Sequence, residues 1–467
     1  MRTSALRALR RPILSTLKTS SPVARFALVP RLNTTGFSTT ATFYNPTNSS
    51  SIPSRSNRSK QFTTDGLRVT IRTEPEWLTF DNLFLRDSCT CPKCLHPSTQ
   101  QKLFATTDIP YDVTPKDVKI HEDGSVEVEW IKDINCEPWN NEPHRSIYSR
   151  EWMNRYSKQK TRRAGHNDPA RKLWNRGKME KNVSFIDYED YMKDEDKLWE
   201  AVLALSQYGL VFLKNCPKDE KAIEGMVERI GELKNTFYGH TWNVKSIKDS
   251  KNIAYTSLNL GHHMDLLYFE SPPGLQFLHS LQNTTTGGSS IFADSFLAAE
   301  KVRIDSPSLF RSLCKFPVTY HYENDGHHYH YSRPVVVEDP YSEKFPRSIS
   351  HVNWAPPFQA HFEGDVGMSE SGAWREWVTA AKQFAGYIDE EDAQFELRLE
   401  EGMCAIFFNR RILHSRRAFD PASGDRWLKG AYVDIDAFYS KYRVLGERQI
   451  QKKKELEEAS KPEYNVY

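Results

Sequence analysis

Three side chains in the sequence could hold a redox-active metal: His263 and Asp265, one residue apart, and His414 much further along the chain. Two histidines and one carboxylate can occupy one face of an iron(II) ion and leave the other face open for substrate and oxygen. A bare His-x-Asp pair is weak evidence, because the chain has 15 His residues and such a pair is often a surface hydrogen bond. An iron site therefore needs support from the surrounding sequence.

A second possible metal site is the cluster formed by Cys89, Cys91 and Cys94. Three thiolates so close in sequence can share one ion, and a closed tetrahedral zinc site needs a fourth ligand. The candidates for this ligand are His144, which we favour, and His96, His121 and Cys136. The alternative is three buried or reactive thiols without metal. A closed site has no open position for substrate, so we expect the zinc to fold a small domain.

The residues around this cluster predict a small β domain over residues 65–150. Residues 67–71 alternate apolar and polar side chains, as a half-buried strand does. Two further alternating runs, 117–121 and 126–130, flank an Asp-Gly turn, which predicts a hairpin because Gly supplies the positive φ of the turn. The polar and basic stretch 151–183 reads as a linker.

A second domain is predicted over residues 184–447. It opens with a helix at 195–207, a buried strand at 210–213 and a helix at 219–230. Short β-type runs separated by turn residues then continue to residue 435. The fold class is therefore mainly β with flanking helices, in a barrel or sandwich. Residues 448–467 are expected to be a charged tail that is helical over 448–461.

The first 64 residues contain ten Lys or Arg and no Asp or Glu. Leu6 and Leu9 would lie near one face of a short helix, which Pro12 would end. An Arg- and Ser-rich leader without acidic residues is typical of a mitochondrial transit peptide. We interpret residues 1–64 as a transit peptide followed by a disordered leader, and expect localisation in the mitochondrial matrix. A disordered basic tail and, more weakly, a nucleic-acid-binding arm are the alternatives.

Composition excludes several other classes of protein. Without the leader, 53 basic residues face 61 acidic ones, a net charge of about −8 that disfavours a nucleic-acid partner. No stretch approaches the roughly 20 consecutive apolar residues of a membrane span, so none is expected. Seven Cys in 467 residues, three of them clustered, favour metal binding in a reducing compartment over a disulfide scaffold.

Several segments of the chain together resemble one known family. They are residues 85–94, 237–242, 252–256, 263–265, 272–276, 286–290, 411–414 and 426–432. With these segments the chain resembles the gamma-butyrobetaine dioxygenases, among the iron(II)- and 2-oxoglutarate-dependent oxygenases that include the taurine dioxygenase group. The segments follow the family's order, which is more specific than any single motif.

The resemblance implies a double-stranded β-helix, or jelly-roll, catalytic domain preceded by a zinc-binding domain. It implies that His263, Asp265 and His414 bind iron(II). Arg426 matches the arginine that holds the distal carboxylate of 2-oxoglutarate, and Ser290 matches a hydroxyl that assists it. This role agrees with the two parallel hydrogen bonds that a guanidinium makes to a carboxylate. The alternative for Arg426 is a surface charge near a turn.

The resemblance also implies a site for a trimethylammonium group. The residues that match the family's aromatic cage are Tyr238, Trp242, Tyr255 and Tyr432, and Asn252 matches a further substrate contact. A trimethylammonium group cannot donate a hydrogen bond, so ring faces stabilise it. Aromatic residues at such positions are otherwise core residues. Leu266 departs from the animal enzymes, which carry at this position a Tyr that meets the substrate carboxylate, and Tyr268 follows nearby.

The implied reaction is hydroxylation of gamma-butyrobetaine to L-carnitine, a step of carnitine biosynthesis, coupled to decarboxylation of 2-oxoglutarate to succinate. It uses iron(II), O₂ and 2-oxoglutarate, with structural zinc and with ascorbate as a supporting reductant. The alternatives are a trimethyllysine dioxygenase or a divergent paralogue acting on another trimethylammonium compound. An alternative of another class is a zinc-containing binding or assembly protein without turnover.

The expected partners are a small-molecule substrate and, by the same resemblance, a second copy of the chain in a homodimer. The histidines of residues 327–330 could suggest a further metal site. We interpret them as an exposed loop or subunit contact.

Overall fold

The computed structural model describes residues 62–73, 76–135, 139, 143–158, 161–162, 171–245, 259–342, 347–366 and 372–460. The predicted leader lies outside these residues except for Phe62–Thr64, which form strand β1, so regular structure begins slightly earlier than predicted. Mitochondrial localisation stays a prediction. Within the described ranges, every helix is too short or too polar to cross a bilayer.

The N-terminal part is a small β domain with its own hydrophobic core. Its elements are β1 (Phe62–Thr64), β2 (Arg68–Thr73), β3 (Glu76–Asp81), α1 (Asn82–Asp87), η2 (Thr106–Asp108), β4 (Thr114–Ile120), β5 (Val126–Lys132), β6 (Arg145–Tyr148) and α2 (Arg150–Ser157). The strands form two antiparallel sheets, β1-β2-β3 and β4-β5-β6. The predicted hairpin is confirmed as β4 and β5, and Gly124 in its turn has φ +81°. Helix α2 packs into this core through Met153, although we predicted a linker from residue 151.

The predicted zinc ligands lie together in this domain. Cys89, Cys91 and Cys94 follow the short helix α1, and His144 directly precedes β6. The His144 Nε2 atom lies 3.3, 3.9 and 3.6 Å from the three Sγ atoms in that order. Ligand atoms of a tetrahedral zinc site with bonds of 2.0–2.3 Å lie roughly 3.6 Å apart, so this Cys₃His cluster is compatible with zinc binding.

Residues around the cluster suit a negatively charged metal site. The fully buried Arg86 donates from Nη1 to Cys94 Sγ at 3.4 Å and from Nε to Asp133 Oδ1 at 2.7 Å. A guanidinium here offsets the charge of three thiolates. Of the alternatives for the fourth ligand, His121 instead faces Glu127, and His96 accepts a hydrogen bond from the Thr99 amide. Cys136 lies outside the described residues.

The C-terminal part is a jelly roll built from two sheets, which confirms the predicted fold class. The larger sheet has the order β7 (Phe185–Asp187), β8 (Leu210–Lys214), β19 (Cys404–Phe408), β11 (Leu275–Asn283), β22 (Arg426–Val433), β9 (Thr241–Lys245). The smaller sheet has the order β10 (Leu260–His263), β20 (Ile412–Arg416), β13 (Ser290–Asp294), β18 (Gln394–Leu397). Three strand pairs complete it: β12 (Thr286–Gly287) with β21 (Phe419–Asp420), β14 (Val318–Asn324) with β15 (His327–Arg333), and β16 (Val336–Glu338) with β17 (Ile349–Val352).

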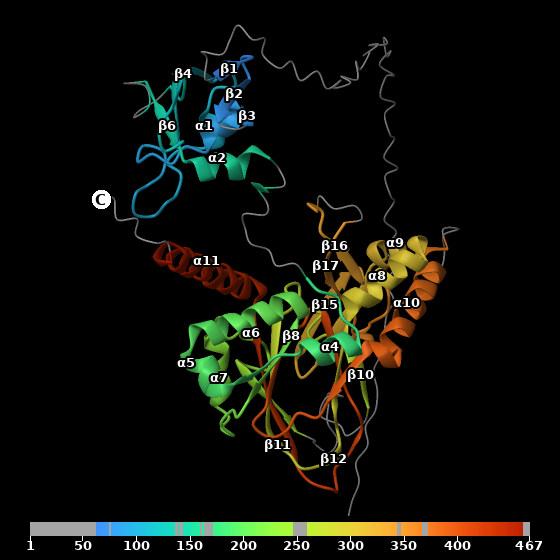
Figure 1. Ribbon diagram of the computed structural model, residues 1–467. Helices are drawn as coiled ribbons and strands as arrows, with labels where there is room; N and C mark the ends of the chain where they lie inside the picture. The colour runs from blue at the N-terminus through green and yellow to red at the C-terminus, as the bar shows by residue number, and fades with distance from the viewer. Residues whose placement is uncertain are drawn as a thin grey trace, which may run out of the picture. The chain divides into compact units, whose positions relative to one another are not determined.

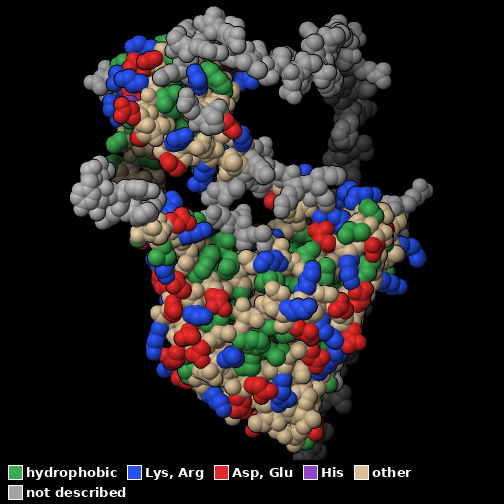
Figure 2. Space-filling model, viewed as in Figure 1, with side chains coloured by type: hydrophobic (Ala, Val, Ile, Leu, Met, Phe, Trp, Pro, Cys, Tyr) green, Lys and Arg blue, Asp and Glu red, His purple; other side chains and the backbone are tan. Residues whose placement is uncertain are grey.

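Helices cover the sheets, and α8, α9 and α10 pack against one another beside the strands (Figure 1). The helices are α4 (Arg176–Asn182), α5 (Tyr188–Lys193), α6 (Glu195–Tyr208), α7 (Ala222–Glu228), α8 (Ser295–Asp305), α9 (Pro307–Lys315), η4 (Pro356–Phe358), α10 (Ala373–Asp389), η5 (Glu391–Ala393) and α11 (Ile435–Ala459). Basic and acidic side chains are interspersed over the visible face of this part (Figure 2).

Three predictions for this part need correction. Residues 231–435 are not β-type throughout, because α8, α9 and α10 interrupt the strands. The histidines of residues 327–330 are not in a loop, because they belong to β15, where His327 is half-buried against the Phe237 ring at 4.9 Å between centroids. The predicted tail is the end of α11, which begins at Ile435 and packs into the core through Phe438.

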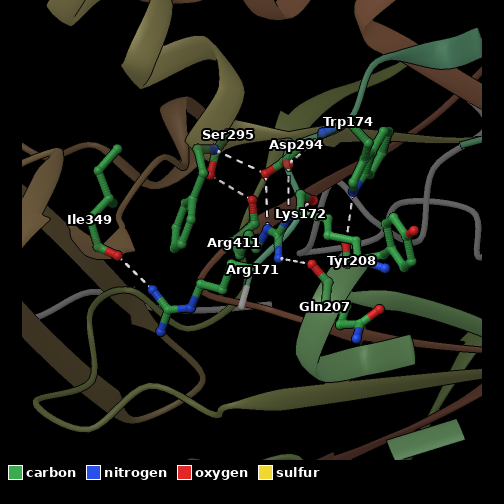
Figure 3. A network of polar contacts seen from close by, with 10 residues as sticks. Arg171, Lys172, Trp174, Gln207, Tyr208, Asp294, Ser295, Ile349 and Arg411 are labelled. Carbon is green, nitrogen blue, oxygen red and sulfur yellow. Dashed lines mark hydrogen bonds and ion pairs between the residues drawn. The ribbon is translucent and has the colours of Figure 1, made fainter. Parts of the chain in front are cut away.

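A buried ion pair links the smaller sheet to helix α6 and to the segment at Lys172 (Figure 3). Arg411, just before β20, donates from Nε and Nη2 to the two carboxylate oxygens of Asp294 at 3.0 and 2.9 Å. The same guanidinium donates to the carbonyls of Gln207 in α6 and Lys172 at 2.8 and 2.7 Å. Both charged residues are 4% exposed. The pair therefore joins the end of β13, the start of β20 and the end of α6.

We expect Arg411→Leu to lower the free energy of unfolding by about 3–5 kcal/mol, because it leaves the Asp294 carboxylate buried without its partner. Urea unfolding followed by circular dichroism measures this change. The control is Arg417→Leu, which removes an exposed ion pair with Glu396 at 3.1 Å and should cost at most about 1 kcal/mol. Equal losses in the two variants would contradict the role of the buried pair.

We expect purified protein to contain about one zinc per chain, and Cys91→Ser to lower that content because it removes one of four ligands. Elemental analysis gives the ratio. Cys314→Ser, which changes a half-buried thiol in α9, is the control and should leave the zinc content as it is. A Cys91→Ser protein with unchanged zinc would rule out the cluster as the site.

Candidate active site

A cavity lies between the two sheets of the jelly roll. From the larger sheet it is lined by residues of β9, β11 and β22, and from the smaller sheet by residues of β10, β13 and β20. The lining residues are Tyr238, Trp242, Val244, Leu260, His263, Asp265, Leu266, Tyr268, Gln276, Leu278, Ser290, Phe292, Phe358, His414, Ser415, Arg416, Arg426, Leu428 and Tyr432. Most of these residues belong to strands, and Phe358 belongs to η4.

The three predicted iron ligands meet in this cavity. His263 ends β10 and pairs directly with His414 of β20, and their ring centroids are 4.2 Å apart. Asp265 Oδ1 lies 3.3 Å from His263 Nε2 and 3.8 Å from His414 Nε2. Ligand atoms at right angles around an ion with bonds of about 2.1 Å lie about 3 Å apart, so small side-chain shifts suffice to bind a metal. One histidine comes from each of two adjacent strands, and the carboxylate follows in the next turn.

Neighbouring groups orient these ligands. His263 Nδ1 lies 2.9 Å from the Gly261 carbonyl, which leaves Nε2 facing Asp265. The buried Asn409 accepts from the Asp265 amide at 2.8 Å and donates to the Asp265 carbonyl at 2.9 Å. The next residue, Leu266, has φ +58°, a conformation that side chains other than glycine rarely adopt. The backbone around Asp265 is thus held in one sharp turn.

The electrostatics of the cavity favour the metal-binding protonation states. Burial and the nearby His263 lower the pKa of His414 to about 3, so its ring is neutral at physiological pH, as a metal ligand must be. Burial alone would raise the pKa of Asp265, but contacts with His263, His414 and Tyr432 bring it below its ordinary value. Burial and the Asp265 carboxylate raise the pKa of Tyr432 well above its usual range, so its hydroxyl stays a donor.

Two buried arginines line the other end of the cavity. Arg426 begins β22 and is 8% exposed, and Arg416 in β20 pairs directly with Ser290 at the start of β13. Burial, Arg416 and Arg398 lower the pKa of Arg426 to about 9, and its Nε atom has no hydrogen-bond partner among the described residues. A buried guanidinium with an open donor suits an anionic ligand such as a carboxylate. Arg426 is therefore not the surface charge that we considered as its alternative.

Aromatic rings line the cavity near Asp265. Trp242 stacks on Tyr432 with centroids 3.9 Å apart, and Tyr238 lies in the same wall. Trp242 pairs with Gly430 across β9 and β22, and a Cβ at Gly430 would lie 2.3 Å from the indole ring. Only glycine leaves room for Trp242 in this position. Ring faces at this end suit an alkylated cation.

The structure brings together most of the predicted site residues. His263, Asp265, His414, Arg426, Ser290, Tyr238, Trp242 and Tyr432 line the one cavity, whereas Asn252 and Tyr255 lie outside the described residues. The sequence interpretation missed Arg416, Gln276 and Phe358 as lining residues. Arg416 could have been found, because it is two residues after His414 and side chains two apart share a strand face. Leu266 and Tyr268 both line the cavity.

Comparison with known proteins agrees with this arrangement. Residues 176–432 match the family described as taurine catabolism dioxygenase TauD, TfdA. Residues 61–154 match the N-terminal domain described as gamma-butyrobetaine hydroxylase-like. The two matches correspond to the jelly roll and to the small β domain with the Cys₃His cluster.

Three curated relatives span most of the chain. Dioxygenase str8 of Strobilurus tenacellus is 35% identical over 412 residues, which cover 85% of this chain and 91% of that protein. A gamma-butyrobetaine dioxygenase of Pseudomonas is 34% identical and covers 78% and 90%. A trimethyllysine dioxygenase of Meyerozyma guilliermondii is 28% identical and covers 78% and 90%. The chain belongs to the TauD/TfdA family, in the gamma-butyrobetaine and trimethyllysine branch, and is an iron(II)- and 2-oxoglutarate-dependent dioxygenase.

Proposed function

We propose that this enzyme hydroxylates a small trimethylammonium substrate, and that the substrate is gamma-butyrobetaine and the product L-carnitine. The observation that carries the proposal is one cavity in which the His263, Asp265 and His414 group lies between a buried arginine and a wall of aromatic rings. These three features match the three components of such a reaction, which are a metal, a dicarboxylate cosubstrate and a cation.

In this proposal each group of residues has a separate task. His263, Asp265 and His414 hold iron(II), which with 2-oxoglutarate and O₂ supplies the hydroxylating chemistry and yields succinate and CO₂. Arg426 and Ser290 bind the distal carboxylate of 2-oxoglutarate. Tyr238, Trp242, Tyr432 and, outside the described residues, Tyr255 and Asn252 hold the substrate. The apolar lining residues Leu260, Leu278 and Phe292 exclude water from the reacting carbon.

The assignment of gamma-butyrobetaine over trimethyllysine rests on two observations. The relative named for gamma-butyrobetaine is 34% identical, whereas the one named for trimethyllysine is 28% identical. The segment 237–242, with Tyr238 and Trp242, resembles the gamma-butyrobetaine branch. Because Leu266 offers no hydrogen-bond donor beside Asp265, the substrate carboxylate needs another partner. Trimethyllysine is the second candidate substrate. The similarity to Dioxygenase str8 makes a different compound the third candidate.

The proposal is tested by measuring succinate formation with iron(II), 2-oxoglutarate and O₂, and with gamma-butyrobetaine, trimethyllysine or no added substrate. We expect gamma-butyrobetaine to stimulate turnover most, and mass spectrometry to detect L-carnitine in equal amount to succinate. Stimulation by trimethyllysine alone would replace our substrate with the second candidate. No stimulation by either would leave the dioxygenase with another substrate.

The same assay, carried out on a variant, also tests the metal-binding group of His263, Asp265 and His414. His414→Ala should abolish succinate formation with every substrate, because two ligands hold iron(II) far less well than three.

We expect Arg426→Met to raise the KM for 2-oxoglutarate by about 10–150-fold, because a charge-assisted hydrogen-bonding group contributes about 1.5–3 kcal/mol. Methionine retains much of the apolar stem, so the fold should persist. Steady-state kinetics at varied 2-oxoglutarate measure the effect. Arg417→Met, at an exposed position, is the control and should leave this KM unchanged. An Arg426→Met enzyme with an ordinary KM would show that the cosubstrate binds elsewhere.

A further inference from the structure

One hydrogen bond connects the aromatic wall to the metal-binding group. The Tyr432 hydroxyl donates to Asp265 Oδ2 at 2.6 Å. The other carboxylate oxygen, Oδ1, is the one that faces the Nε2 atoms of His263 and His414, at 3.3 and 3.8 Å. The two oxygens of Asp265 therefore have different environments, one for a metal and one for a tyrosine.

The rest of Asp265 is already fixed. Asn409 holds its main-chain N–H and C=O groups, and the same Asn409 amide donates to the Pro273 carbonyl at 3.2 Å. Asn409 itself is fully buried. Rotation of the Asp265 side chain is then the main freedom that remains to this ligand. The Tyr432 hydroxyl opposes this rotation at Oδ2, while His263 Nε2 faces Oδ1.

Tyr432 is well placed to hold that orientation. Its backbone pairs with Gln276 in the middle of the larger sheet, and its ring is 2% exposed and stacked on Trp242. Because both its backbone and its ring are fixed, Tyr432 cannot move with the Asp265 carboxylate when that carboxylate rotates. An aromatic ring alone would serve a cation equally well, so the cage role does not account for the hydroxyl.

We propose that Tyr432 is a positioning residue for the metal: its hydroxyl holds Asp265 with one oxygen directed at the ion, so that a wall of the substrate pocket and a metal ligand form one rigid unit. This inference rests on the proposed metal role of His263, Asp265 and His414 but not on the identity of the substrate. Partners that orient a ligand in this way typically change metal affinity by about 10–100-fold.

The test is the affinity of the Tyr432→Phe protein for cobalt(II), measured by titration without oxygen, 2-oxoglutarate or substrate. Zinc is supplied first at one equivalent per chain, so that it occupies the cysteine cluster and leaves the His263, Asp265 and His414 site for cobalt, and thiolate-to-cobalt absorption reveals any cobalt at the cysteines. We expect the Kd to rise about 10–100-fold, and the visible cobalt(II) spectrum to change because the carboxylate is free to bind through either or both oxygens. An unchanged Kd and spectrum would overturn the inference.

The matched control is Tyr191→Phe. Tyr191 is also fully buried, and its hydroxyl donates to the Met226 carbonyl at 2.8 Å, away from the cavity lining. Both variants lose one buried hydrogen bond, so a general loss of stability would affect them alike. We expect the Tyr191→Phe protein to bind cobalt(II) as the unaltered protein does, and equal weakening in both variants would refute a specific role for Tyr432.

The His414→Ala variant tests the metal site separately from the role of Tyr432. If His414→Ala loses cobalt(II) binding and Tyr432→Phe does not, the metal group stands and the role of Tyr432 is wrong. If His414→Ala binds cobalt(II) normally, the metal group itself is wrong.

Discussion

The site depends on the antiparallel pairing of β10 with β20, which sets His263 opposite His414. Side chains alternate between the two faces of a strand, so a shift of one residue would turn either histidine out of the cavity. The pairing is reinforced on the far side of β20, where Phe292 of β13 lies opposite His414, and at the start of β20 by the Arg411–Asp294 ion pair. The two histidines are thus positioned by strand register, and Asp265 is positioned by the turn that follows β10.

Much of this arrangement could be predicted from the sequence, because its signals are local residue patterns or motifs that follow a fixed order along the chain. The 117–130 hairpin has alternating residues around an Asp-Gly turn, and α6 has regularly spaced apolar residues before Gly209. The metal ligands were found through residue type, and they gained weight from their order with Arg426 and the aromatic residues. His144 could be predicted only as one of four candidates for the fourth zinc ligand. Nothing in the sequence around it shows that it lies beside Cys89, which is more than 50 residues away in the chain.

Of the features that were not predicted, one had a clear sequence signal and the others had none. Helix α10 has a regular apolar face of Trp377, Ala381, Phe384 and Ile388, so its omission was a failure to apply the helical period rather than an absent signal. By contrast, the bond between Tyr432 and Asp265 joins residues 167 positions apart and depends on three-dimensional closeness alone. Asn409 and Arg416 are similar, because their tasks are defined by neighbours from other strands. Sequence patterns identify ligands more readily than the groups that orient them.

The contact between Gly430 and Trp242 limits how this pocket can diversify. Any side chain at residue 430 must displace the indole ring, which would in turn free Tyr432, so the three positions can change only together. Leu266 and Phe358 line the same cavity and are not part of this contact between Gly430 and the indole ring. Related enzymes with different substrates should therefore differ first at these apolar positions. The aromatic wall of Trp242 and Tyr432 should persist as a unit even in relatives that bind a different ligand.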